Sequence, residues 1–266
     1  MFEYLTETIS IIYGAISTII AYKTYKNSKE ETKKREALET SIKVAGRTQN
    51  YAFSVTKQVK EVVLNNKGGA TINTLWDGIN PNQAFTNLKI PVRFSATGDY
   101  IEINKPLIKT LPDSDFDVIL EKPIVIGNGT KNARFEGYFV VNGHCEPENC
   151  NIRFQSIQDL KGGYTLTAAA ARTRYRKSDW KQEYVSTVNM VPIDHLVLRI
   201  KFPYLLDKMT GSAIPVVFCN GTHTIHTRET HEVQKGFEIT GADSVELTVD
   251  KPSPLLTYAI SWMPPD

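Results

Sequence analysis

The sequence predicts an all-β domain, a β-sandwich, preceded by a long N-terminal helix whose first part crosses a membrane once. Three observations lead to this fold class. Strand-like patterns recur at intervals of roughly 8–12 residues, turn residues separate them, and an apolar segment of membrane length stands near the start. The expected parts are a transmembrane helix over 1–25, a connecting helix over 26–66, a linker over 67–85 and a sandwich over 86–266.

The apolar segment runs from Leu5 to Tyr22, and about 18 helical residues span about 27 Å, close to the hydrocarbon core of a bilayer. Its flanking charges favour a membrane span over a signal peptide, because Glu3 and Glu7 precede it and lysines from Lys23 onward follow it. Basic residues after the span place the C-terminal domain in the cytoplasm. A buried helix of a globular domain is the alternative.

Small and polar residues lie along one face of this predicted helix, while isoleucines cover the rest of it. Lipid favours apolar side chains all round, so a sorted face predicts contact between copies of the helix or around water. The residues of this predicted pore or oligomer face are Glu3, Glu7, Ser10, Gly14, Ser17 and Ala21.

The same heptad stripe continues through Leu38, Ile42 and Ala45 to Val59 and Val63. It predicts one continuous helix that ends before the glycine pair of the linker. Few stripe positions are large, which argues against a tight two-stranded coil. A looser bundle of several chains, packing against the chain's own domain, and a solvated spacer helix all remain open.

Strand patterns follow the linker, and the clearest alternates Leu196, Leu198 and Ile200 with polar neighbours. No long helical period interrupts them, which favours one double-sheet domain. The predicted strands are Leu88–Ser95, Asp99–Ile103, Phe116–Ile126, Arg134–Asn142, Asn151–Ile157, Tyr164–Ala171, Tyr184–Val191, His195–Phe202, Ile214–Cys219, His223–Arg228, Phe237–Ile239, Ser244–Val249 and Leu255–Met263.

A basic and aromatic cluster stands out within the β region. On a strand, alternate arginines share one face at a spacing of roughly 7 Å, and guanidinium groups bind phosphate in a bidentate manner while aromatic rings stack on bases. The alternative is an edge strand protected from aggregation by its charge. The predicted ligand-binding residues are Arg172, Arg174, Tyr175, Arg176, Lys177, Trp180 and Lys181.

Metal and catalytic motifs give weaker signals. His223 and His226 fall on opposite faces of the expected strand, which is poor geometry for one zinc ion. His144, Cys145 and Cys150 could supply three zinc ligands, but no fourth ligand is evident. The sequence contains no glycine-rich phosphate loop and no His-Glu-x-x-His. We therefore predict no metal site, no cofactor, no catalytic residues and no enzyme.

These patterns favour an oligomeric membrane effector in which the β domain binds a nucleotide or oligonucleotide and gates an ion-conducting pore built from the N-terminal helices. One helix cannot enclose a channel, so self-association is required. A membrane-tethered β-sandwich scaffold that binds a partner without channel activity is the alternative, and a membrane-anchored enzyme is a third hypothesis.

The order of these parts resembles the membrane effectors of bacterial anti-phage defence, in particular Hailong-type channel effectors. The resemblance covers the layout of the whole chain and no shared motif, so the arginine cluster is not carried over from that family. It implies a bacterial inner-membrane location, a homo-oligomer such as a tetramer, and an oligonucleotide or cyclic nucleotide made by a partner nucleotidyltransferase. The β-barrel effectors of cyclic-oligonucleotide systems are the next most similar group. They resemble proteins with two membrane spans, whereas this chain has one predicted span.

Overall fold

The computed structural model describes residues 51–147, 150–175, 182–219 and 227–266. The chain divides into two compact units, and every described residue belongs to the second, Gln49–Asp266. The predicted transmembrane helix over 1–25 and most of the predicted connecting helix over 26–66 therefore lie outside the described residues.

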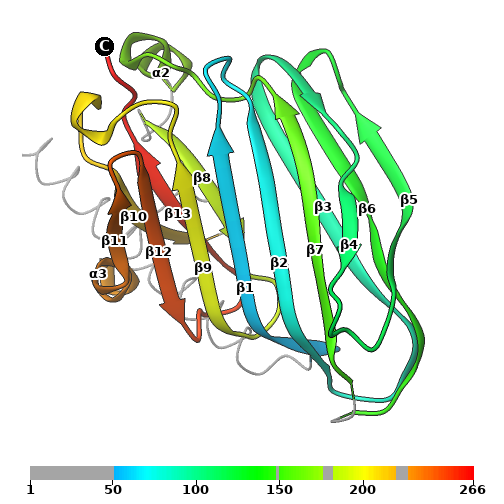
Figure 1. Ribbon diagram of the computed structural model, residues 1–266. Helices are drawn as coiled ribbons and strands as arrows, with labels where there is room; N and C mark the ends of the chain where they lie inside the picture. Colours follow the sequence, from blue (N-terminus) through cyan, green and yellow to red (C-terminus); the bar gives the residue numbers. More distant parts are fainter. Residues whose placement is uncertain (1–50, 148–149, 176–181, 220–226) are drawn as a thin grey trace, which may run out of the picture. The chain divides into compact units, whose positions relative to one another are not determined.

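Strands make up most of the described unit (Figure 1). Its first half contains β1 (Phe53–Leu64), β2 (Ala70–Pro81), β3 (Phe85–Ile103), β4 (Leu107–Thr110), β5 (Val118–Ile126), β6 (Thr130–Cys145) and β7 (Ile152–Lys161). Its second half contains α2 (Ala168–Arg174), β8 (Glu183–Val188), β9 (Ile193–Lys201), the 3-10 turn η1 (Leu206–Lys208), β10 (Ile214–Cys219), α3 (Thr227–Lys235), β11 (Phe237–Gly241), β12 (Ser244–Asp250) and β13 (Leu256–Trp262).

The described strands form two sheets. The larger has ten strands in the order β11-β12-β9-β1-β2-β7-β3-β6-β5, with β4 paired to β7 off this path. The smaller has three strands in the order β10-β13-β8. Within the described part of the chain only β1 and β9 pair in parallel; the other pairs are antiparallel.

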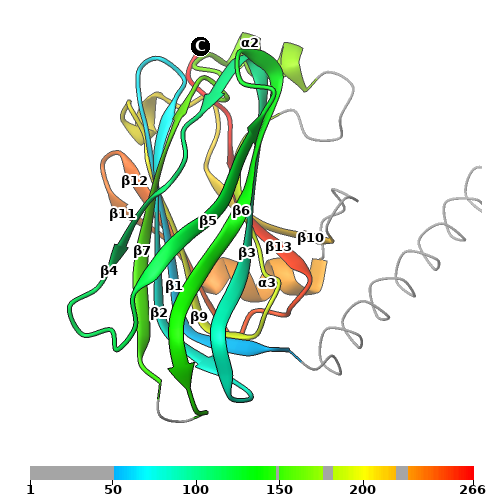
Figure 2. The same cartoon turned by 90° about the vertical axis from the view of Figure 1, so that its right-hand side faces the viewer.

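Strand β3 folds the larger sheet into two layers. Its residues from Phe85 to Ile101 pair with β6, whereas only Glu102 and Ile103 pair with β7. Figure 2 shows β3 and β6, and also β13 and β10, on the same side of the layer that contains β1, β2, β7 and β9. The described unit is thus a β-sandwich. One layer contains β1, β2, β7 and β9, and the opposite layer is formed by β3 and β6 of the ten-stranded sheet together with the three-stranded sheet.

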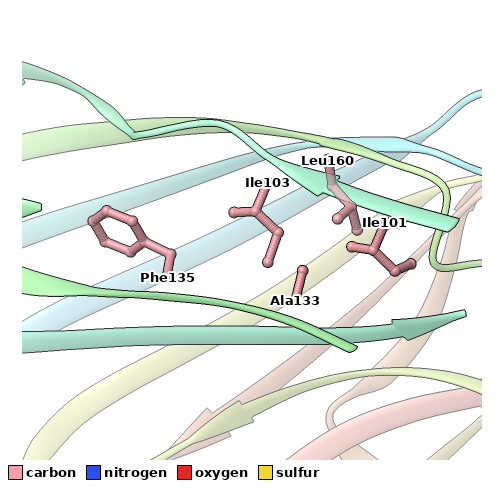
Figure 3. Packing of buried hydrophobic residues seen from close by; sticks show 5 residues of the cluster. All are labelled: Ile101, Ile103, Ala133, Phe135 and Leu160. Atoms are coloured by element: carbon pink, nitrogen blue, oxygen red, sulfur yellow. The ribbon is translucent and has the colours of Figure 1, made fainter. Parts of the chain in front are cut away.

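Apolar side chains from both layers meet where β3 changes partner. Ile101, Ile103, Ala133, Phe135 and Leu160 form one buried cluster between the strands (Figure 3). Each is at most 3% exposed. Burial of a large apolar side chain contributes roughly 1.5–3 kcal/mol, so this cluster holds the two layers together.

The described unit is β-rich, which is consistent with the sandwich part of the predicted fold class, but the long helix in front of it is wrong over 53–64. These residues form β1 and pair with β2 and β9. Four valines and a threonine in this segment favour a strand. The spacing of these β-branched residues also matches a heptad, which is why the sequence pattern indicated a helix. The coiled-coil interpretation is wrong for this segment.

The predicted linker over 67–85 is largely a strand, because Ala70–Pro81 forms β2 and completes a hairpin with β1. The side-chain oxygen of Asn65 closes the turn, accepting hydrogen bonds from the backbone N–H groups of Lys67 and Gly69. Gly78 has a φ of +69° and lies where the pairing with β7 shifts register. Gly78, a turn-forming residue in the sequence, thus lies at a β-bulge inside the strand.

Residues predicted as the strand Tyr164–Ala171 instead lead into helix α2. Thr167 caps the helix, since its Oγ1 accepts a hydrogen bond from the N–H of Ala170 at 3.3 Å. Alanine is the strongest helix former, and Ala168 and Ala171 are fully buried. The N–H of Ala168 also donates to the backbone oxygen of Pro265, which fixes the C-terminal segment beside the helix.

Over the described ranges, no helix has the length and apolar character needed to cross a bilayer. The single-pass inner-membrane location with a cytoplasmic C-terminal domain therefore has no support in the structure. We withdraw it.

Candidate functional site

Five polar or amphipathic side chains lie together on the inner face of β1, β2 and β7, where the sandwich core would be expected. In the strand register Lys60 stands beside Thr74, which stands beside Ser156, and Gln58 stands beside Trp76. The same face carries the buried Val62 and Ile72 one step along the strands. We call Gln58, Lys60, Thr74, Trp76 and Ser156 the interior polar patch.

Lys60 points across the sandwich. Its Nζ donates a 2.7 Å hydrogen bond to the backbone oxygen of Ser186 on β8 and lies 5.9 Å from the centre of the Phe94 ring on β3. Burial lowers the pKa of Lys60 from 10.5 to about 8. The charged amine is therefore disfavoured in the folded protein, which makes Lys60 a costly choice for a purely structural position.

Trp76 places an N–H group in the interior without a matching acceptor among the residues that the structure describes, and the amide of Gln58 lies beside it on the same face. The Trp76 indole stacks on Phe154 with ring centres 6.0 Å apart, yet its buried Nε1 finds no hydrogen-bond partner among the described residues. The Gln58 side chain is 6% exposed and makes no hydrogen bond within the described part of the chain. By contrast, Gln158 on the same face donates to the backbone oxygen of Asn104. An unsatisfied buried polar group costs about 1–3 kcal/mol.

The patch lies beneath a break in the opposite layer. Up to Thr97, β3 bonds only to β6, and β8 bonds only to β13, among the described strands. Lys60 contacts both sides of this break, through Phe94 on β3 and Ser186 on β8. Lys60, Thr74 and Trp76 are only half-buried although they point inward. These three side chains thus keep partial exposure to solvent, whereas Gln58 and Ser156 are buried.

A second polar cluster surrounds the carboxylate of Glu183, which is 1% exposed. The N–H and hydroxyl of Thr165 both donate to its Oε1, Arg174 Nη1 lies 3.3 Å from the same oxygen, and the Tyr175 hydroxyl donates to Oε2. We call Thr165, Arg174, Tyr175 and Glu183 the Glu183 cluster. The Glu183 carboxylate is paired with Arg174, and both of its oxygens accept hydrogen bonds. The cluster therefore has a structural role and holds α2 in place.

Arg174 ties this cluster to two other segments, because its guanidinium donates to the backbone oxygens of Gly163 and Thr97. Burial, followed by the nearby Glu183 charge, raises the pKa of Tyr164 and Tyr175 far above 10. Both tyrosines are therefore neutral at physiological pH, and the Tyr175 hydroxyl acts as a hydrogen-bond donor to Glu183.

The structure separates the predicted ligand-binding residues. Arg172 and Arg174 lie in a helix, where two residues differ by about 200° in direction, so they do not share a face. Arg172 is exposed, whereas Arg174 and Tyr175 are engaged by Glu183. The remaining predicted ligand contacts, Arg176, Lys177, Trp180 and Lys181, lie outside the described residues.

All residues of the predicted pore face, from Glu3 to Ala21, also lie outside the described residues. Within the described ranges no group of three or more His, Cys, Asp or Glu side chains is arranged to hold a metal ion. Cys145 and Cys150 form a disulfide with their Cα atoms 6.0 Å apart. The two cysteines considered as zinc ligands are therefore bonded to each other.

The interior polar patch was missed by sequence reasoning. A period of two along β1 places Gln58 and Lys60 on the face of Val62 and Leu64, and this signal was present in the sequence. It was hidden by the heptad interpretation. Thr74, Trp76 and Ser156 became part of the patch only through strand pairing.

Comparisons with known proteins assign no family to this chain. No protein-family model matches it. No curated protein matches it either.

Solved structures with some likeness are hydrolases. Leukotriene A4 hydrolase from Saccharomyces cerevisiae matches with 13% identity and a TM-score of 0.36, over 79% of this chain and 29% of that one. An M1 zinc metallopeptidase from Deinococcus radiodurans matches with 6% identity and a TM-score of 0.34, over 80% and 43%. The chain thus spans less than half the length of these proteins, and TM-scores below 0.5 assign no activity.

The prediction that the protein is not an enzyme is withdrawn: the solved structures that match are hydrolases, and at TM-scores below 0.5 they assign this chain neither an activity nor the lack of one. The nucleotide-gated channel and its tethered-scaffold alternative are withdrawn as well, because both require a membrane helix and the described residues contain no helix that could span a membrane.

Proposed function

We propose that the described unit is a binding domain that holds a small molecule against the interior polar patch. The observation that carries this proposal is the convergence of Lys60, Trp76 Nε1 and the Gln58 amide on one inner face. Stability alone favours apolar residues there, and proteins keep such costly polar groups where function requires them.

The position of the patch supports the same function. Binding sites are concave, mostly apolar and fitted with a few polar groups that orient the ligand. Here the half-buried ring of Phe94 borders the patch, while Lys60 and Thr74 supply half-buried polar groups. Among the described strands β3 and β8 are not paired, so no sheet hydrogen bonds join the two parts of the opposite layer here.

Binding can be followed at the Trp76 indole N–H in full-length, ¹⁵N-labelled protein. The chain has three tryptophans, so its indole region is simple, and a Trp76→Phe variant identifies the signal. We expect members of a fragment set of small acids, amides and amines to shift this signal in a saturable way. The proposal fails if no fragment shifts it while the protein remains folded.

The resemblance to anti-phage effectors, the self-association and the oligonucleotide or cyclic nucleotide ligand stay predictions. No finding on the described residues bears on them. Of the predicted phosphate contacts that the structure describes, Arg172 is exposed and its side chain makes no hydrogen bond or ion pair within the described ranges.

A further inference from the structure

The interior polar patch is dominated by hydrogen-bond donors. Lys60 carries three N–H groups when protonated, of which one is directed at Ser186. The Trp76 indole can only donate, and the hydroxyls of Thr74 and Ser156 and the amide of Gln58 can donate as well. A ligand that satisfies this face must supply acceptors.

The charge of the patch is also unbalanced. Its neighbours on the inner face of β1, β2, β7 and β9 are apolar or uncharged, among them Val62, Ile72, Phe154, Leu196 and Leu198. The lowered pKa of Lys60 has burial as its only cause, so no charged group near it compensates the amine. The one charged residue of β8, Glu183, is already paired with Arg174.

We infer, building on the proposed function, that the ligand of the interior polar patch is a carboxylate with a flat apolar body. The carboxylate accepts hydrogen bonds from the half-buried Lys60 and Thr74, and the Gln58 amide lies on the same face beside them. The body lies against the half-buried ring of Phe94, which is beside Lys60. One amine balances one negative charge, which favours a carboxylate over a phosphate dianion.

Benzoate and benzamide test this inference because they share a shape and differ in charge. Each is titrated into full-length, ¹⁵N-labelled protein while the Trp76 indole signal is observed. We expect benzoate to bind at least about tenfold more tightly, since a hydrogen bond to a charged group is worth about 1.5–3 kcal/mol. Equal affinity, or tighter binding of benzamide, overturns the carboxylate and leaves the binding function standing.

Lys60→Met supplies the matched variant, with Lys57→Met as its control. Lys57 lies on the same strand but is exposed. We expect Lys60→Met to reduce benzoate affinity to that of benzamide and Lys57→Met to leave it unchanged. Benzoate that binds Lys60→Met as tightly as wild type contradicts the role of the amine. If Lys60→Met does not fold, Lys60→Gln keeps a polar group at this position and is held to the same outcomes.

The failures of the two proposals can be told apart. A Trp76 signal that responds to neither benzoate nor benzamide, nor to any other fragment, removes the binding function and the carboxylate with it. A signal that responds to neutral fragments alone removes only the carboxylate. Inorganic phosphate that displaces benzoate with equal affinity contradicts the single-charge argument.

Discussion

Lys60 and Ser186 join the two layers of the sandwich: Nζ of Lys60 on β1 donates a 2.7 Å hydrogen bond to the backbone oxygen of Ser186 on β8. This contact crosses from the ten-stranded sheet to the three-stranded sheet. It holds an amine in the interior at a position that an apolar side chain could occupy. The effect of this amine on the free energy of unfolding and its effect on ligand binding can be measured separately.

The first prediction concerns the pH dependence of stability. The folded pKa of Lys60, about 8, lies below its ordinary value of 10.5, so the unfolded chain binds more protons between these values. The free energy of unfolding of the wild type is therefore expected to rise from pH 8 toward pH 10. Lys60→Met should lack this rise and be more stable at pH 7 by about 1–2 kcal/mol.

Denaturant unfolding at several pH values measures this, with Lys57→Met as the control that should follow the wild type. Above pH 10 an opposite effect sets in. Burial raises the pKa of Tyr204 to about 12, so its neutral form is favoured in the folded state and stability declines as tyrosines ionise. A Lys60→Met profile parallel to that of the wild type between pH 8 and 10 contradicts the prediction.

The second prediction compares two tryptophans. Trp76→Phe keeps a ring to stack on Phe154 and removes an indole N–H that has no partner among the described residues. Trp262→Phe removes the 3.0 Å hydrogen bond from its Nε1 to the Tyr204 hydroxyl at a site that is 1% exposed. Trp262→Phe should therefore cost about 1–2 kcal/mol more in unfolding free energy than Trp76→Phe.

Thermal and denaturant unfolding of both variants provide the comparison. If Trp76→Phe proved the more destabilising, its indole N–H would have a partner, and the main observation behind the binding site would be lost.

The third prediction addresses the Glu183 cluster. Glu183→Gln replaces a buried carboxylate by an amide and leaves the Arg174 guanidinium without its counter-charge. We expect a loss of about 2–4 kcal/mol in unfolding free energy. Glu238→Gln, on the exposed strand β11, is the matched control and should change stability by less than about 0.5 kcal/mol.

A double-mutant cycle with Arg174→Met tests whether the two residues act as a pair. The double variant should lose less than the sum of the single variants, because removal of both charges leaves neither unpaired. Additive losses would show that Glu183 and Arg174 act independently.

The fourth prediction concerns the turn between β7 and α2. Gly162 has a φ of +69°, and a Cβ at this position would lie 2.0 Å from the backbone oxygen of Tyr100. Gly162→Ala should destabilise the protein by about 2–4 kcal/mol. At Gly211 the nearest atom to a new Cβ is Met263 Cβ at 3.8 Å, so Gly211→Ala should stay within about 0.5 kcal/mol of the wild type. Equal effects of the two substitutions would contradict this account.

Part of the fold could be predicted from local patterns. The alternation of Leu196, Leu198 and Ile200 identified β9, and Gly127-Asn128-Gly129 forms a turn in which the Asn128 amide both accepts from and donates to the backbone of Ile103. The first hairpin was missed because its valines also match a heptad and its second strand is rich in turn-forming residues. Pairing with β7 and β9, which no local pattern reports, decided both strands.

Local sequence patterns specified which side chains alternate along strands such as β9 and where glycine-containing turns interrupt the chain. Both features depend on the geometry of neighbouring residues. Only the tertiary structure decided that Lys60, Thr74 and Ser156, from three strands, stand side by side, and that Arg174 faces Glu183 rather than solvent. The physical reason is that register and layer packing arise from contacts between residues far apart in the chain, and the alternation of a single strand carries no information about its partner.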